Sequence, residues 1–162
     1  IFVAIFLGYS LGSAPIISFH YGAGNHDELK NMRKKSLRLI AVWGIGMTII
    51  SHIFALPFAR FFVGYDSELL AMTIHGFRIY AFVYLLNGFN IFGSSFFTAL
   101  NNGMVSATIS FLRTLVFEVI CILLLPVFFG IDGIWSAVLV AEALALCVTS
   151  FFLITKRSRY HY

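Results

Sequence analysis

The chain has 162 residues, of which 60% are apolar and 11% are charged, and it carries a formal net charge of +4. Ordinary soluble domains are about 45–50% apolar and about 25% charged, so this composition excludes a soluble globular domain and predicts a chain that lies in a lipid bilayer. Eight of the eleven Lys and Arg residues stand in two short segments beside apolar runs, at 30–38 and 156–159. That distribution is typical of membrane flanks and excludes nucleic acid as a partner.

The first predicted element is an apolar transmembrane helix over residues 1–21. Small residues recur every four positions at Ala4, Gly8 and Gly12, which places them on one helix face where a second helix can approach closely. Pro15 lacks a backbone donor and therefore predicts a bend in this helix.

A charged loop is predicted over residues 22–36, and Gly22 and Gly24 give it a flexible start. Asp27 and Glu28 precede the bases of this loop, an order that suits the dipole of a short helix. The bases indicate that the loop lies in the cytoplasm.

Two further spans are predicted at residues 37–62 and 71–100, each long enough for the ~20 residues that cross a bilayer. The acidic turn between them is expected on the outer face. The second of these spans carries Asn87 and Asn90, three residues apart on one helix face. Amides at that depth either join helices by hydrogen bonds or contact a substrate, and the sequence leaves both interpretations open.

The last two spans are predicted at residues 104–128 and 134–155, and a basic tail follows at 156–162. Four spans separate the loop 22–36 from this tail, so an even number of crossings returns both basic segments to one side. The sequence therefore predicts an all-α polytopic bundle of five transmembrane helices in one domain. Residue 1 is expected outside and the C-terminus in the cytoplasm.

Three ionisable side chains, Arg113, Glu118 and Glu142, fall deep within these last spans. Charges at the bilayer centre are costly and point to a functional site. Arg113 and Glu118 lie five apart, a spacing that does not favour a direct pair on one helix. We expect an interhelical pair of Arg113 with Glu142, and Glu118 turned toward a cavity. The carboxylates then either respond to a proton or cation on a substrate path, or form a structural ion pair.

Motifs for catalysis and metal binding are missing from the sequence. It contains no nucleotide-binding loop, no zinc-protease motif and no nucleophile elbow, and its histidines lack metal-ligand spacing. We expect no enzyme, no metal site and no cofactor, and a pump without a nucleotide site would have to draw on an ion gradient or on a partner.

Several segments carry a resemblance to a known family. They are the helix exit P-I-I-S-F-H-Y-G-A-G-N, the turn N-N-G, the segment L-R-T-L-V-F-E-V and the segment P-V-F-F-G-I-D-G-I-W, at Pro15–Asn25, Asn101–Gly103, Leu112–Val119 and Pro126–Trp135. In this order the chain resembles the last five helices of a twelve-helix MATE (multidrug and toxic compound extrusion) transporter. Because the chain begins inside an apolar segment, we expect a fragment that lacks the N-terminal half.

The resemblance implies two six-helix lobes around a central cavity, which exchange organic cations or drugs for Na⁺ or H⁺ by alternating access. It implies a cell membrane location, with a bacterial cytoplasmic membrane expected, and the N-terminal half as partner. Some family members use an acidic residue on helix ten, where this chain has Asn87 and Asn90. That departure favours coupling through the absent half, with Glu118 and Glu142 as local candidates.

Two other functions stay open at this point. A flippase for lipid-linked oligosaccharides of the related superfamily needs bases along its cavity, and only Arg78 and Arg113 qualify. A truncated membrane interaction module needs no transport at all. Ethidium efflux by the complete gene product would separate an exporter from such a module.

Overall fold

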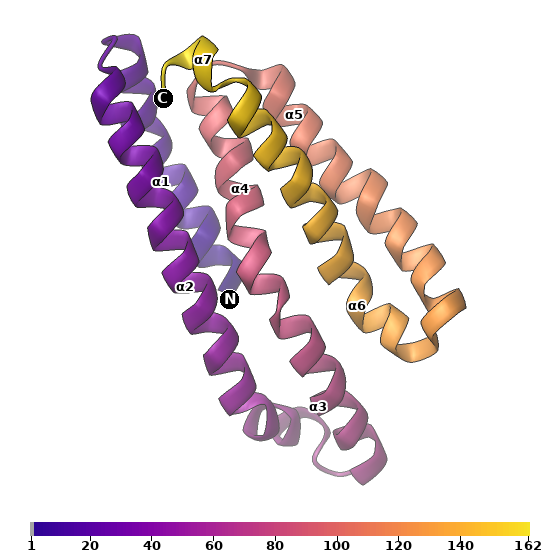
Figure 1. Ribbon diagram of the computed structural model, residues 1–162. Coiled ribbons are helices and arrows are strands. Elements are labelled where there is room, and N and C mark those ends of the chain that lie inside the picture. Colours follow the sequence, from indigo (N-terminus) through magenta and orange to yellow (C-terminus); the bar gives the residue numbers. More distant parts are fainter. Residues whose placement is uncertain (1) are drawn as a thin grey trace.

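The computed structural model describes residues 2–162 and consists of helices joined by short turns (Figure 1). The helices are α1 (Phe2–Gly22), α2 (His26–Val63), α3 (Ser67–Ala81), α4 (Val83–Ala99), α5 (Gly103–Phe111), the π-helix η1 (Leu112–Phe117), α6 (Glu118–Thr155) and α7 (Arg157–Tyr160). No strand occurs within residues 2–162. The predicted all-α fold is confirmed.

Three helical segments are long and apolar enough to cross a membrane, namely Phe2–Gly22, His26–Val63 and Gly103–Thr155. The pair α3 and α4, bent by 41°, makes a fourth. The segment Gly103–Thr155 reverses direction at Gly130, so its two arms lie side by side in Figure 1. The chain therefore passes along the bundle five times: once each in α1, α2 and the bent pair α3–α4, and twice in the two arms of Gly103–Thr155.

The reversal in α6 depends on two glycines. Gly130 has φ 58° and ψ −133°, a backbone conformation that residues with a Cβ rarely adopt. Gly133 packs so closely that a Cβ there would collide with the carbonyl oxygen of Leu125. The sequence G-I-D-G therefore closes this hairpin at one end of the bundle.

The structure differs from the prediction at the start of α2. The sequence predicts a loop over residues 22–36, but α2 begins at His26 and runs without a break to Val63. The Asn25 side chain accepts a hydrogen bond from the Glu28 backbone N–H and so caps the helix. Leu29 is completely buried, which anchors this extension against the bundle.

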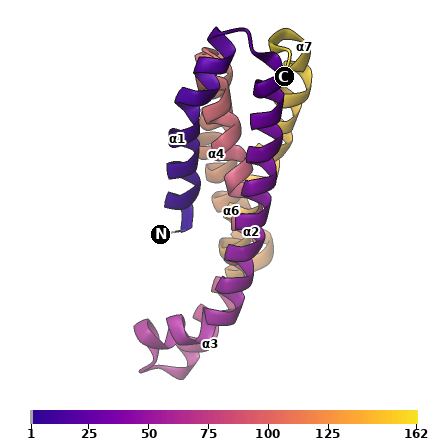
Figure 2. The same ribbon diagram turned by 90° about the vertical axis from the view of Figure 1, so that its left-hand side faces the viewer.

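The predicted span 71–100 is also interrupted, because α3 ends at Ala81 and α4 begins at Val83. The Thr48 hydroxyl of α2 donates to the Ala81 carbonyl at 3.2 Å and so gives a partner to a backbone group at the break. Figure 2 shows α3 extending beyond the end of α1. The bend between α3 and α4 therefore lies at a contact with α2, made by a residue 33 positions earlier in the sequence.

Among residues 2–162, the small-residue face of α1 is not where helices approach closely. A Cβ added to Gly8 or Gly12 would meet no atom within 4 Å, whereas the buried side of α1 carries Phe6 and Ile17. Within residues 2–162 no helix approaches this face closely, so the predicted close approach stays a prediction for a helix outside this chain. The helix also continues through Pro15 to Gly22.

Close helix contacts occur instead along α4 and α6. A Cβ on Gly88 would lie 2.6 Å from the Phe6 ring, and a Cβ on Gly93 would collide with Thr149. On α6, buried small residues follow one another at intervals of four, at Gly133, Ala137, Ala141, Ala145 and Thr149. This spacing lets α4 and α6 pack closely.

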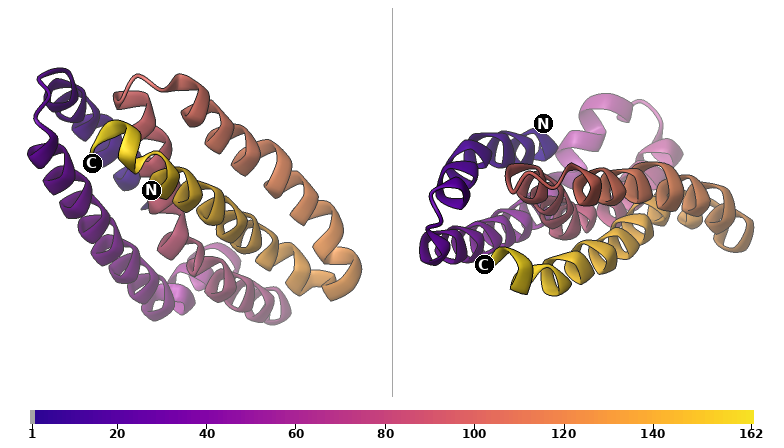
Figure 3. Two further views of the ribbon diagram at one scale, coloured as in Figure 1. Left: turned by 45° about the horizontal axis from the view of Figure 1, so that its top comes forward. Right: turned by 90° about the horizontal axis from the view of Figure 1, so that it is seen from above.

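The two basic segments meet at one end of the bundle. Gly24 (φ 68°) ends α1 in a Schellman turn, in which the Asn25 N–H donates to the His20 carbonyl at 2.9 Å. Tyr21 in α1 then packs against Tyr160 in α7, with ring centroids 5.7 Å apart. Figure 3 shows the C-terminus beside the start of α2. The loop region and the tail thus lie on the same side, as the even number of spans predicts.

Candidate functional site

A buried polar network joins α4, η1 and α6 around the Glu142 carboxylate, which belongs to a residue only 5% exposed. Asn87 Nδ2 donates to Glu142 Oε1 at 2.9 Å, and Asn90 Nδ2 donates to Oε2 at 2.7 Å. Arg113 Nε donates to Oε1 at 2.9 Å, and its Nη2 lies 2.8 Å from the same oxygen. The predicted interhelical pair of Arg113 with Glu142 is present.

The two asparagines contribute unequally to this network. Asn90 also donates to the Glu142 backbone carbonyl at 2.9 Å and accepts from the Thr149 hydroxyl at 2.9 Å. Asn87 donates to the carboxylate, but its buried Oδ1 has no hydrogen-bond partner among residues 2–162. Asn90 therefore holds α4 to α6 at three points, and Asn87 holds it at one.

The Glu142 charge is compensated in place. Its side chain is 6% exposed and that of Arg113 is 22% exposed, so both charges are largely shielded from solvent. A buried pair of this kind is stable only when further hydrogen bonds satisfy its oxygens, and the two amides supply them. The geometry is that of an ion pair that ties η1, α4 and α6 together.

The guanidinium comes from a π-helical turn. In η1 the Glu118 N–H donates to the Arg113 carbonyl, five residues earlier. Such turns are rare and frequently occur at functional sites. The inference from the five-residue spacing of Arg113 and Glu118 assumes α-helical geometry, which does not apply across this turn.

Glu118 stands apart from the network. Its side chain is half-buried, and its carboxylate makes no hydrogen bond or ion pair within residues 2–162. The phenol of Tyr80 on α3 lies within electrostatic range of Glu118, Glu142 and Arg113. The structure therefore separates the two deep carboxylates into a paired one and an unpaired one.

Hydroxyl groups continue the polar surface along α4. Ser94 and Thr98 follow Asn87 and Asn90 at intervals of four residues, and Ser94 Oγ lies 2.9 Å from Ser106 Oγ on α5. Sequence reasoning missed Ser94, Thr98 and Thr149. The repeat spacing from Asn90 onward was the signal that would have identified the first two.

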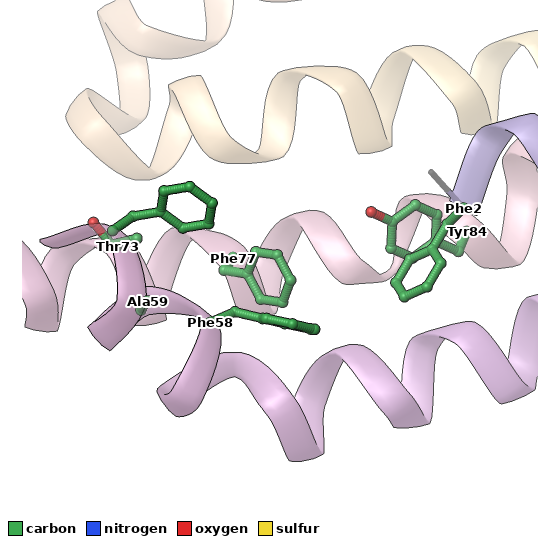
Figure 4. A pocket seen from close by; sticks show the side chains of 7 residues that line it. Phe2, Phe58, Ala59, Thr73, Phe77 and Tyr84 are labelled. Atoms are coloured by element: carbon green, nitrogen blue, oxygen red, sulfur yellow. The ribbon is translucent and has the colours of Figure 1, made fainter. Parts of the chain in front are cut away.

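A separate aromatic cavity of about 310 Å³ opens near the C-terminal end of α2 (Figure 4). Its lining residues are Phe2, Phe58, Ala59, Phe62, Thr73, Phe77 and Tyr84. The rings of Phe58 and Phe77 have centroids 6.5 Å apart, and those of Phe2 and Tyr84 are 5.2 Å apart. The volume is at the lower end of the range for small-molecule sites.

The apolar helices and the buried polar network describe a polytopic membrane protein, and the comparisons with known proteins show its family. The MatE family model matches residues 1–124, which is more than half of the chain. The chain belongs to the MatE family. No curated protein matches it.

Two solved structures show the same fold. The Vibrio cholerae MATE transporter VcmN in its bent form is 20% identical with a TM-score of 0.85, and the match covers 98% of this chain and 37% of that one. An inward-facing multidrug resistance MATE family transporter of the MOP superfamily is 18% identical with a TM-score of 0.89, covering 99% and 37%. The chain thus spans just over a third of these transporters.

Proposed function

We propose that this chain is the C-terminal lobe of a secondary-active exporter that exchanges organic cations and drugs for Na⁺ or H⁺ by alternating access. The observation that carries the proposal is the MatE match over residues 1–124, joined to a bundle that superimposes on 37% of a multidrug transporter. The partner is the N-terminal half of the same transporter, which completes the cavity. The location is a cell membrane, with both basic segments in the cytoplasm.

Within this chain the two deep carboxylates have different tasks. Glu142 accepts hydrogen bonds from Asn87, Asn90 and Arg113, so a cation entering there would have to displace a guanidinium. Glu118 carries a carboxylate with no such partner in the described part of the chain. We therefore assign the structural lock to Glu142 and the response to the coupling cation to Glu118.

The aromatic cavity is the part of this lobe best suited to a flat organic cation. Ring faces attract cations, by about 0.5–2 kcal/mol for each well-placed contact. Phe58 and Phe77 provide two such faces, and Thr73 provides a hydroxyl. Figure 4 shows these side chains around one space.

The test is ethidium efflux from drug-sensitive cells that express the complete gene product, with the 162-residue chain alone as comparison. We expect efflux by the complete product that stops when the Na⁺ and H⁺ gradients are dissipated, and none by the chain alone. Translocation of a lipid-linked oligosaccharide without ethidium efflux would replace the exporter by a flippase. Absence of both activities would leave a membrane interaction module.

A further inference from the structure

A basic cavity lies at the end of the bundle where the two basic segments meet. It has a volume of about 530 Å³ and is lined by Lys30, Arg33, Lys34, Leu37, Arg38 and Arg157. Five of these six residues are cationic. They come from the first turns of α2 and from α7. These two segments lie next to each other near the C-terminus of the chain in Figure 3. The transport function proposed above uses none of them.

Few negative charges balance this cluster. Asp27 lies 3.8 Å from Lys30, and it is the one acidic residue within residues 2–162 that pairs with a base of the cavity. Arg157 Nε donates to the Tyr162 backbone oxygen at 3.1 Å. Arg33, Lys34 and Arg38 line the cavity with no carboxylate paired to them among residues 2–162.

Arg33 is held in place by packing against the C-terminal residue. Its guanidinium stacks on the Tyr162 ring at 5.0 Å, and its Nε is buried without a hydrogen-bond partner in the described chain. Burial raises the pKa of Tyr162 to about 12, so its phenol stays neutral and supplies no counter-charge.

Apolar surface adjoins the charges. Leu37 lines the basic cavity, and Ile154, which is 73% exposed, lines a neighbouring cavity of about 480 Å³ together with Lys30, Arg157 and Ser158. Arg38 is the last base before the uncharged membrane run of α2. A ligand at this depth meets cations on one side and bilayer on the other, which is the position of a lipid headgroup.

We propose that the basic cavity binds the phosphate of an anionic phospholipid, which bridges α2 and α7 and holds the C-terminal tail against the bundle. Arg33 and Arg157 supply the planar donors that suit phosphate oxygens, and Lys30, Lys34 and Arg38 add charge. The acyl chains run along Leu37 and Ile154 into the bilayer. Basic cavities at the cytoplasmic ends of transmembrane helices are suited to such headgroups.

The test uses the complete gene product, delipidated in neutral detergent and titrated with phosphatidylglycerol or phosphatidylcholine. Native mass spectrometry counts the retained lipids. We expect phosphatidylglycerol to be retained in preference to phosphatidylcholine. The double variant Arg33→Gln/Arg157→Gln should weaken this retention about 25-fold, at about fivefold for each base.

A second double variant, Lys34→Gln/Arg38→Gln, changes exposed residues only and should weaken retention about 25-fold without disturbing the packing of Tyr162. The matched control Arg60→Gln/Arg78→Gln removes the same charge from two exposed bases outside the cavity and should leave retention unchanged. Equal retention of both lipids, or an equal loss in the control, would overturn the proposal. Displacement of the lipid by millimolar inorganic phosphate would replace a lipid site by a site for the free anion.

Discussion

At the scale of single residues, the two deep glutamates differ in what surrounds them. Removing the Glu142 charge leaves the Arg113 guanidinium largely buried without its partner, whereas Glu118 has no partner within residues 2–162 to lose. Breaking a buried pair on one side costs about 3–5 kcal/mol, while removing both charges costs less. The environment of each carboxylate, and not its depth, therefore decides its role.

We predict that Glu142→Gln lowers the free energy of unfolding of the complete gene product by about 3 kcal/mol, and that adding Arg113→Gln recovers most of the loss. Glu118→Gln should leave stability unchanged but remove the dependence of efflux on the coupling ion. Melting curves in detergent and efflux at several pH values and Na⁺ concentrations measure these effects. Ion-dependent efflux that survives in Glu118→Gln would contradict the assignment.

A second prediction at the scale of single residues concerns the aromatic cavity. Phe58→Ala and Phe77→Ala should each raise the half-saturating ethidium concentration about fivefold, since each removes a ring face worth about 1 kcal/mol. Phe151→Ala removes a ring of the same size that is 60% exposed and should have no effect. A similar shift in all three variants would show that the cavity does not select the cation.

At the scale of helices, close approach depends on which glycines are packed. Gly88→Ala places a methyl group 2.6 Å from the Phe6 ring and 2.7 Å from Ile40, so we expect it to cost about 1–3 kcal/mol. Gly8→Ala meets no atom within 4 Å and should be neutral or slightly stabilising. Melting temperatures of the two variants compare them directly. Unchanged stability in Gly88→Ala would show that α4 does not pack as closely as described.

A further prediction concerns the hairpin at Gly130, where α6 reverses direction. Gly130→Ala forces a Cβ into a positive-φ conformation and should destabilise the complete gene product by about 1–3 kcal/mol. Gly22→Ala, at a helical glycine with free space around it, is the matched control and should not destabilise it. If both variants melt at the wild-type temperature, the backbone at Gly130 does not have the conformation described.

At the scale of the whole molecule, both basic segments lie at one end of the bundle and the α2–α3 turn lies toward the other (Figure 1). We predict that, in a Cys121→Ala/Cys147→Ala background, Asn31→Cys and Ser158→Cys react with an impermeant maleimide only in inverted vesicles. Ser67→Cys should react in intact cells. Labelling of Asn31→Cys and Ser158→Cys from opposite sides would refute the five-span arrangement.

The arrangement of the whole molecule also concerns the exposed face of α1 that carries Gly8 and Gly12. Gly8 and Gly12 are exposed and no helix within residues 2–162 packs on them, while more than half of the length of related transporters lies outside this chain. We therefore expect this face to contact the other lobe. Gly8→Leu should reduce efflux by the complete gene product without lowering its melting temperature.

Local features of the chain were predictable because they depend on residues close together in sequence. The apolar spans follow from composition, and the turns at Gly24, Asn101 and Gly130 follow from residue types that tolerate positive φ. The end of the bundle that carries both basic segments follows from the number of spans between them. Each of these features survives without knowledge of any distant contact.

The contacts between helices were decided only by the tertiary structure. Asn87 and Glu142 are 55 residues apart, and no periodicity indicates that the amide turns toward that carboxylate. The sequence likewise marked the small residues of α1, whereas the packed ones lie on α4 and α6. By itself the sequence determined that the chain crosses a bilayer, because hydrophobicity is a sum over neighbouring residues. The tertiary structure decided which charges are paired and which helix faces are buried, because those depend on where distant segments meet.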